Sequence, residues 1–483
     1  MSRSLLACAA LLLTMACPAS GQQVVRFAEP DRLDMARAYL RFDRALAASS
    51  LENAAEIASL PFDRATTLFF SGRDTSALPI LSDLNVQLLQ ESSKETRRLL
   101  ESKRIAADPA IIVAGPRRQV TIRLTPIFDP GAVAPVEASV LLLDPNGDVR
   151  LRTTVALARG EARALELPRD ALDVPGGWTV VLRAGEVEVD AVALHVVREP
   201  LDEAVPRLER ALAAIEVAET LIDAAAATRD RLALLSPEPT PFLTARLMAQ
   251  PAGLLQQLER DIALLRRGID PFRSRPGETW RTLSHAGTRV PMRVYAPAHV
   301  LDDTAPLIIA LHGAGADEQM WLSGFNDGQL RALADEHGFI VACPSTYALV
   351  GGPLVLDRVL DVLDESYQID RDRVAIIGHS LGGFVASRMA QLRSDRIDAV
   401  CCFAGARPFE PDRPTARALI VGAGRDPIIA AGPLRALSEQ AQAEGLPVEY
   451  RHMETIGHTT VVNAALEESI LWILDGWSGG LVE

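Results

Sequence analysis

Lysine is almost missing from this chain of 483 residues, which contains only Lys94 and Lys103. Nearly all of its basic side chains are arginine, and we ascribe this to compositional bias of the genome rather than to function. Acidic residues outnumber basic ones, so the formal net charge is −14. This balance disfavours nucleic acid as a partner, because binding to phosphates depends on clustered positive charge.

Cysteine is also scarce. Beyond residue 21 the chain contains only Cys343, Cys401 and Cys402. The number is odd, two of the three are adjacent, and all three lie near the ends of apolar, strand-like runs. The pattern predicts buried free thiols and gives no support to a disulfide framework.

Long apolar runs are missing except at the start of the chain. Arg3 precedes the apolar run Leu5–Ala16, and the small residues 19–21 follow it. This order is typical of a signal peptide cleaved after Gly21, and it predicts a periplasmic or extracellular protein. Cys17 leaves a lipid-anchored form open as an alternative. No later stretch reaches about 18 apolar residues, so we expect no membrane span.

The length predicts several domains. From the changes in pattern we expect a signal peptide at 1–21, a helical region at 22–110, a β-sandwich domain at 111–200, a helical hairpin at 201–268 and a catalytic domain at 269–483. The expected fold is therefore multidomain, with helical segments and a sandwich before the catalytic domain.

The two helical regions are predicted from apolar positions at three- and four-residue spacing. In the first region this spacing covers Asp31–Ser49 and Ser82–Ile105, with Pro61 and Pro79 interrupting the middle, and no residues there have catalytic spacing. In the second region, the same spacing of apolar residues predicts helices over 201–234 and 241–267. We expect the helices before and after the sandwich to pack together; independent helical linkers remain the alternative.

Residues 111–200 change to short runs that alternate between apolar and polar positions. Turn residues separate the runs, as at Asp144-Pro-Asn-Gly147 and Pro175-Gly-Gly177. About seven such strands predict an immunoglobulin-like β-sandwich. Phe128 and Trp178 are the only large aromatic residues between 111 and 198, so a carbohydrate-binding row of aromatic side chains is not favoured.

Residues 269–483 alternate strand and helix patterns. An antiparallel strand pair is expected within Glu278–Tyr295, and buried strands follow at Leu307–Leu311, Phe339–Ala342 and Val374–Gly378. Helical patterns separate these strands and continue to residue 475. The order predicts a doubly wound, mostly parallel α/β sheet.

The stretch Arg373–Ser387 contains the strongest motif of the chain. An apolar strand ends at Gly378, Ser380 follows, and a helical pattern starts after Gly382. This is a G-x-S-x-G sequence between a strand and a helix, which is typical of a nucleophile elbow. Small residues are needed on both sides because a serine at so sharp a turn leaves no room for side chains there.

A serine hydroxyl needs a base and an orienting acid. Asp426 follows the strand Arg417–Val421, and His458 lies in the loop after the last strand. Both would lie at the same sheet edge as Ser380, with His458 as general base and Asp426 holding its ring. His452 is the rival base, but it falls within a strand pattern rather than after it.

The loop His312-Gly313-Ala-Gly315 follows a strand and matches an oxyanion-hole motif. We assign the two donors to the backbone N–H groups of Ala314 and Leu381. His312 is expected to brace this loop, and His379 to be structural. Met320 and Trp321 are candidates for the substrate pocket, with simple packing as the alternative.

Together, these motifs resemble the α/β-hydrolase superfamily. The closest resemblance is to polyhydroxybutyrate-depolymerase-like and feruloyl-esterase-like carboxylesterases, with related predicted peptidases. It covers about 200 C-terminal residues and implies neither a metal nor another cofactor. The segment between Cys343 and Gly378 lacks the aromatic-rich insertion expected of a depolymerase, which argues against a polymer substrate.

The sequence thus predicts an exported serine esterase that forms a covalent acyl-enzyme. Its partner would be a small-molecule or polymer-attached ester, and the front half would hold the catalytic domain near a surface, polymer or partner. A serine peptidase of the same fold and an inactive binding or scaffold protein remain alternatives. The oligomeric state is left open.

Overall fold

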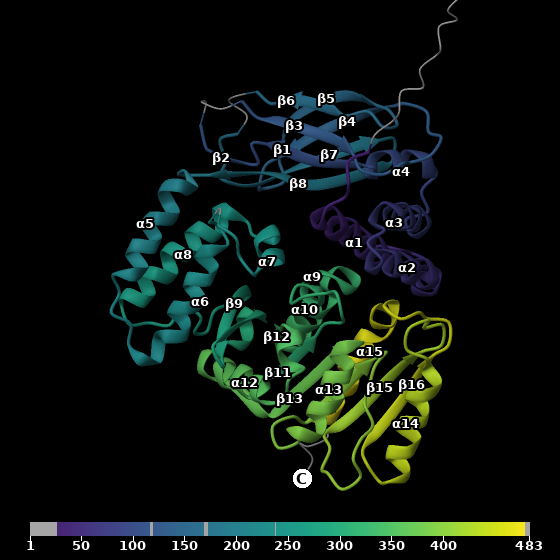
Figure 1. Cartoon of the computed structure of the whole chain (residues 1–483), viewed down its shortest axis with the longest axis vertical. Coiled ribbons are helices and arrows are strands. Elements are labelled where there is room, and N and C mark those ends of the chain that lie inside the picture. The colour runs from purple at the N-terminus through teal and green to yellow at the C-terminus, as the bar shows by residue number, and fades with distance from the viewer. Residues whose placement is uncertain (1–26, 116–118, 169–171, 237, 479–483) are drawn as a thin grey trace, which may run out of the picture.

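The computed structural model describes residues 27–115, 119–168, 172–236 and 238–478 (Figure 1). The predicted signal peptide and the Cys17 anchor lie outside the described residues. Figure 1 shows a layered β region at one end of the molecule, the C-terminal α/β region at the other, and helices between them.

The first helices are α1 (Arg32–Ala47), α2 (Ala54–Phe70), α3 (Asp74–Leu88) and α4 (Lys94–Glu101). Helix α1 begins where Asp31 and Asp34 each accept a hydrogen bond from the other's backbone N–H, which satisfies donors at the helix start. The rings of Phe42 and Phe62 stack at 4.4 Å in the core shared by α1, α2 and α3. Pro61 and Pro79 lie within α2 and α3 and interrupt neither helix.

The β region consists of two sheets. One has the order β1-β3-β6 and the other β2-β8-β7-β4-β5. Their strands are β1 (Lys103–Asp108), β2 (Ile111–Val113), β3 (Thr121–Pro126), β4 (Val136–Leu143), β5 (Val149–Leu157), β6 (Arg163–Glu166), β7 (Gly176–Ala184) and β8 (Val187–Val197). Both sheets contribute to one apolar core around the fully buried Trp178. The immunoglobulin-like topology stays a prediction.

The first strand corrects one expected boundary. Residues 103–105 were expected to end a helix, but they belong to β1, which pairs antiparallel with β3. Burial alternates along these residues as it does in a strand: Lys103, Ile105 and Ala107 are buried, while their neighbours are more exposed. The β region therefore begins before the predicted position 111.

The second set of helices is α5 (Leu201–Ala213), α6 (Ile222–Ala233), α7 (Leu243–Met248) and α8 (Pro251–Arg266), with the short 3-10 helix η1 (Glu219–Leu221) between α5 and α6. The two long helices expected here are thus each divided. This set forms its own apolar core with Trp280 and Phe272, separate from that of α1–α3. The expected packing of the two helical regions against each other is therefore wrong.

The C-terminal region contains an eight-stranded sheet of order β16-β15-β14-β13-β11-β12-β10-β9. The strands are β9 (Gly277–His285), β10 (Thr288–Ala296), β11 (Ala305–Leu311), β12 (Ile340–Pro344), β13 (Ile369–His379), β14 (Ala399–Phe403), β15 (Arg417–Ala423) and β16 (Val448–Met453). β12 to β16 and β11 run parallel, whereas β9 and β10 form the predicted antiparallel pair. The doubly wound sheet is confirmed.

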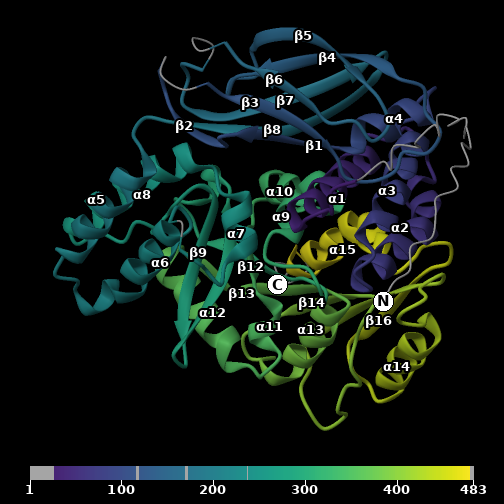
Figure 2. The same ribbon diagram turned by 45° about the horizontal axis from the view of Figure 1, so that its top comes forward.

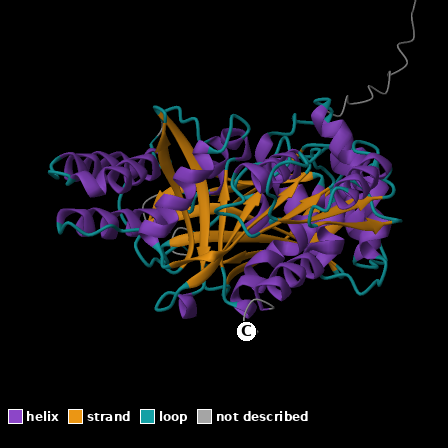
Figure 3. Ribbon diagram, turned by 90° about the horizontal axis from the view of Figure 1, so that it is seen from below, coloured by secondary structure: helices purple, strands orange, loops and turns teal. Residues whose placement is uncertain are grey.

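Helices cover both faces of this sheet (Figure 3). On one face lie α12 (Leu354–Ser366), α13 (Leu381–Leu392) and α14 (Ala431–Ala443), and on the other α9 (Met320–Ser323), α10 (Phe325–His337) and α15 (Thr460–Ser478). The short helices η2 (Ala298–Val300) and α11 (Thr346–Leu349) lie in connections. Among the described helices, none is long and apolar enough to cross a membrane.

The first helices of the chain pack against the second face of the C-terminal sheet. Helix α1 contacts α10, and α2 contacts α15, as Figure 2 shows. The N-terminal residues therefore lie beside the loops that follow the parallel strands, where the predicted catalytic residues are placed.

Candidate active site

Ser380 lies at the turn between β13 and α13 and has the backbone angles φ 53° and ψ −113°. A non-glycine residue rarely adopts this conformation, and such strain is concentrated at functional sites. A Cβ added to Gly378 would lie 2.3 Å from the backbone of Gly382, and one added to Gly382 would lie 2.1 Å from the carbonyl oxygen of Leu311. The two glycines are therefore required by space.

Asp426 and His458 form a hydrogen-bonded pair. Nδ1 of His458 donates to Oδ2 of Asp426 over 2.6 Å, and the two side chains are 5% and 0% exposed. The other carboxylate oxygen accepts from the backbone N–H groups of Ile428 and Ile429 at 2.7 and 2.8 Å. With Nδ1 committed to the carboxylate, Nε2 is the ring nitrogen left to accept a proton.

Ser380 and His458 line the same cavity, which has a volume of about 520 Å³. The loop Gly313–Asp317 after β11 forms another part of its wall. Residues from the ends of β11, β13, β15 and β16 thus meet at one edge of the sheet. The arrangement brings a serine, a histidine and an aspartate to one cavity, and these are the residue types that acyl transfer by a serine hydrolase uses.

The predicted oxyanion-hole residues Ala314 and Leu381 belong to the loop after β11 and to the start of α13. Ala314 lines the cavity. Leu381 is the first residue of α13, so its backbone N–H has no acceptor within the helix. The backbone N–H of Gly315 donates to the hydroxyl of Tyr347 over 2.7 Å, a contact that the sequence analysis missed. The role of the Ala314 and Leu381 N–H groups as oxyanion donors remains a prediction.

His312 braces this loop through both ring nitrogens. Nε2 accepts a hydrogen bond from the backbone N–H of Thr346 at 3.0 Å, so Nδ1 carries the proton and donates to the carbonyl oxygen of Gly313 at 2.8 Å. Burial lowers the pKa of His312 and keeps the ring neutral. A Cβ on Gly313 would lie 2.9 Å from the ring of His379, and one on Gly315 would lie 2.5 Å from the ring of Phe70, so neither glycine of the loop tolerates a side chain without movement.

The buried ring of His379 supports the loop that carries His458. Its Nε2 donates to the carbonyl oxygen of His458 at 3.0 Å, and the two rings lie 4.9 Å apart. Burial, with a smaller effect of the neighbouring His458, lowers the pKa of His379 to about 3. The ring is therefore neutral at physiological pH. His452, the rival base, forms hydrogen bonds with Tyr450 and Glu454 and is not among the residues that line the cavity.

The two residues expected in the substrate pocket differ in position. Met320 lines the cavity. Trp321 is fully buried and packs against Phe325 at 4.8 Å and Phe403 at 6.1 Å, away from the cavity wall. The assignment of Trp321 to substrate binding is therefore corrected: adjacent residues of a short helix point to different surroundings, and this one completes the core.

Two residues of α2 that were not predicted from the sequence hold the loop that carries His458. The carboxylate of Asp63 accepts from the backbone N–H groups of His458 at 2.9 Å and Thr459 at 3.3 Å. The hydroxyl of Ser59 accepts from the N–H of Gly457 at 2.9 Å. Burial raises the pKa of Asp63, while the hydrogen bonds from the two N–H groups oppose the increase. No local pattern in the sequence indicates these contacts.

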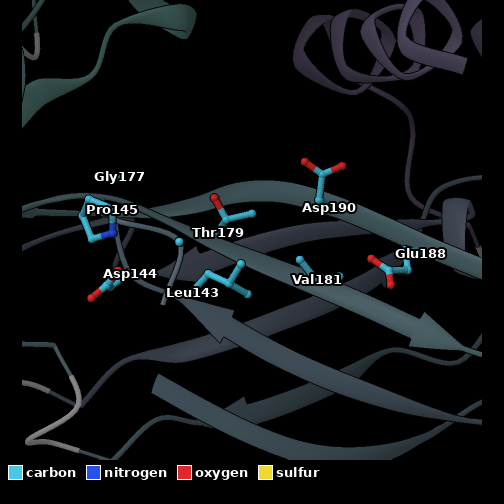
Figure 4. A pocket seen from close by; sticks show the side chains of 9 residues that line it. Leu143, Asp144, Pro145, Gly177, Thr179, Val181, Glu188 and Asp190 are labelled. Atoms are coloured by element: carbon cyan, nitrogen blue, oxygen red, sulfur yellow. The ribbon is translucent and has the colours of Figure 1, made fainter. Parts of the chain in front are cut away.

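A second cavity, of about 420 Å³, lies on the β region formed by β1–β8 and includes Asp144, Glu188 and Asp190 (Figure 4). Each carboxylate already has a partner. Asp144 accepts from the backbone of its own turn, Glu188 pairs with Arg183, and Asp190 pairs with Arg44 at 3.2 Å. Among the described residues, no group of three or more His, Cys, Asp or Glu side chains is arranged to hold a metal ion.

Cys343, Cys401 and Cys402 are buried free thiols, as predicted. Burial raises the pKa of Cys401 to about 12 and raises the pKa values of Cys343 and Cys402 well above the ordinary value of a thiol. A thiol that stays protonated is a poor nucleophile, so these cysteines belong to the core rather than to the chemistry.

The doubly wound sheet, the strained serine turn and the histidine–aspartate pair define the C-terminal region as an α/β-hydrolase domain. Residues 308–468 match the model of the alpha/beta hydrolase family. Feruloyl esterase B of Thermothelomyces thermophilus is 28% identical over 159 residues, which are 27% of this chain and 53% of that protein. Feruloyl esterase B of Neurospora crassa is 29% identical with the same coverage.

The predicted resemblance to feruloyl-esterase-like carboxylesterases is thus confirmed for the C-terminal region. The chain spans about half the length of the curated relatives it matches. A solved ferulic acid esterase of Anaeromyces mucronatus is 17% identical, covers 40% of this chain and 89% of its own, and has a TM-score of 0.36. The family match begins at residue 308 and so does not include α1–α8.

Proposed function

We propose that this protein is a serine hydrolase that cleaves a carboxylic ester through a covalent acyl-enzyme on Ser380. The observation that carries the proposal is the Asp426–His458 hydrogen bond of 2.6 Å beside a cavity that Ser380 shares. The bond fixes the ring tautomer, so that Nε2 of His458 is the base. The similarity to feruloyl esterases supports an ester as substrate.

In the first step the Ser380 oxygen attacks the ester carbonyl carbon while its proton passes to Nε2 of His458. The tetrahedral intermediate then collapses, the bond to the alcohol oxygen breaks, and His458 returns the proton to that oxygen. Water then repeats the sequence on the acyl-enzyme and releases the acid. Asp426 keeps its hydrogen bond to Nδ1 and stabilises the charged imidazole.

The developing oxyanion needs two donors, for which we propose the N–H groups of Ala314 and Leu381. One follows β11 and the other begins α13, so the helix N-terminus adds a favourable field. Loss of one such donor typically raises the barrier by on the order of 3 kcal/mol. The bracing of this loop by His312 and Tyr347 supports the proposal, because preorganised donors lose no energy in reorientation.

We also propose that the protein is exported. The support is the order of Arg3, the apolar run Leu5–Ala16 and the small residues that follow it. Expression of the full chain in a Gram-negative host, followed by fractionation and N-terminal sequencing, tests this. Mature protein that starts at residue 22 in the periplasm agrees with cleavage, and uncleaved protein in the cytoplasm contradicts export.

Labelling with a fluorophosphonate probe tests the nucleophile, with Ser380→Ala as the control. Mass spectrometry should find the adduct on Ser380 and nowhere else. A comparison of p-nitrophenyl esters with peptide p-nitroanilides then separates the esterase from the peptidase, and we expect hydrolysis of the esters. If folded protein resists the probe and hydrolyses neither class, the inactive binding or scaffold protein is favoured instead.

A further inference from the structure

We propose that α1 and α2 build the acyl-binding pocket of this enzyme, and that the pocket accepts an uncharged, apolar acyl group. The inference rests on the function proposed above and goes further by naming the substrate class. The family match and the notable sequence motifs all lie in the last third of the chain, so nothing in them assigns a role in binding to residues 27–70.

The cavity beside Ser380 has two walls. The catalytic side comes from the loops that carry Ser380, His458 and residues 313–317, together with Met320 and Ile428. The opposite side comes from the N-terminal helices. The residues that line the cavity on this side include Met35, Ala36, Tyr39 and Leu40 of α1, and Phe62, Ala65, Thr66, Phe69 and Phe70 of α2.

The N-terminal wall is fixed in place against the catalytic side. The hydrogen bonds from the His458 loop to Asp63 and Ser59 join α2 to the base itself. Phe70 packs so closely on the oxyanion loop that a Cβ at Gly315 would lie 2.5 Å from its ring, and Tyr39 lies similarly close to Gly324. The helices thus belong to the site and are not a separate unit that happens to lie nearby.

The charges of the lining side chains indicate which kind of acyl group the cavity can bind. Among the residues that the structure describes, only two charged side chains outside the proposed catalytic residues line the cavity, Arg32 and Asp317, and they lie 3.8 Å apart with opposite charges. An ionised acyl group would therefore be desolvated without a free partner, at considerable cost. An apolar group instead contacts aromatic and aliphatic side chains, and a volume of about 520 Å³ is within the range of small-ligand pockets.

The test compares p-nitrophenyl acetate with p-nitrophenyl octanoate on the full chain, because only the acyl group differs. Each buried methylene contributes a factor of about four, so kcat/KM for octanoate should exceed that for acetate by on the order of tenfold or more. Thr66→Trp places a large ring on the cavity wall and should lower the octanoate-to-acetate ratio at least on the order of tenfold. Leu60→Trp is the matched control, since Leu60 lies on the same helix, is 53% exposed and does not line the cavity.

Binding to the Ser380→Ala protein gives a readout that does not depend on turnover. Calorimetry should detect p-nitrophenyl octanoate binding, and Thr66→Trp in that background should weaken it while Leu60→Trp does not. Equal kcat/KM for the two esters, or a ratio that Thr66→Trp leaves unchanged, overturns the pocket. Octanoate binding without any probe labelling or hydrolysis would instead contradict the proposed function and leave the pocket supported.

Discussion

The carboxylate of Asp63 accepts a hydrogen bond from the backbone N–H of His458, a residue 395 positions later in the chain. It accepts a second from Thr459, so one buried side chain of α2 sets the path of the loop that carries the proposed base. A misplacement of about 1 Å at a reacting group can cost on the order of a hundredfold in rate. Asp63 is therefore a positioning residue of the site.

Replacement Asp63→Asn tests this role. The amide oxygen can accept from one N–H, but the NH2 group would face the other, so the loop must shift. We expect kcat for p-nitrophenyl acetate to fall by on the order of tenfold to a hundredfold while KM changes little. Glu52→Gln, which removes an exposed charge just before α2, is the control and should leave both constants as they are. An unchanged kcat in Asp63→Asn would show that the contact only stabilises the fold.

Asp426→Asn should remove most of the activity without unfolding the protein. The amide would donate toward Nδ1 of His458 and favour the wrong ring tautomer. In the well-studied serine hydrolases the corresponding change lowers kcat by about 10⁴-fold. Stopped-flow or long-time assays with p-nitrophenyl esters measure the effect, and the exposed Asp412→Asn provides the control. A loss of less than about tenfold would mean that Asp426 is not the orienting acid.

Asp43 of α1 gives a prediction about pH. Burial raises its pKa to about 7 from an ordinary value of 3.8, although Asn463 and the backbone of Asn326 donate to it. The folded protein therefore keeps a proton that the unfolded chain releases, and this contribution to stability is lost as pH rises from about 4 through 7.

Asp43→Asn imitates the protonated carboxyl at every pH. The difference in unfolding free energy between this variant and the wild type should therefore shift in favour of the variant between pH 4.5 and 7.5. Urea unfolding at several pH values measures it, and the comparison cancels the titration of other groups, such as His379. A difference that is constant with pH would contradict the raised pKa.

The three buried cysteines should not react with thiol reagents in the folded protein. We expect Ellman's reagent to leave Cys343, Cys401 and Cys402 unmodified until denaturant is added, because the thiols are buried and their pKa values are raised. Peptide mapping assigns the modified positions. A reductant should leave the melting temperature unchanged, whereas a clear decrease would reveal a disulfide.

The sequence allowed the local features of the catalytic region to be predicted, because each depends on neighbours in the chain. The glycines around Ser380 are required by steric exclusion within one turn, and the placement of Asp426 and His458 after strands follows from a parallel sheet. The succession of strands along the chain, including the antiparallel β9–β10 pair, follows from the same alternation of short apolar runs, whereas the order of the strands in the sheet was not predicted.

The rest depends on contacts between distant segments, which periodicity cannot show. Nothing around Asp63 or Ser59 distinguishes them from ordinary polar residues of a helix. The apolar face of α1 and α2 indicates burial but not the partner, so the predicted packing on the second helical region was wrong. Trp321 and Met320 are adjacent, and only the packed structure shows that one lies in the core and the other at the cavity.

The joining of α2 to the loop of His458 has a consequence for how the molecule is made. The helices that complete the site are synthesised first, and the loop that they hold is synthesised almost last. Until the C-terminal residues emerge, Asp63 and Ser59 lack the backbone N–H groups of residues 457–459 from which they accept hydrogen bonds, so the nascent chain has no complete site. Hydrolytic activity therefore requires that the N-terminal helices and the C-terminal loop of His458 have packed together.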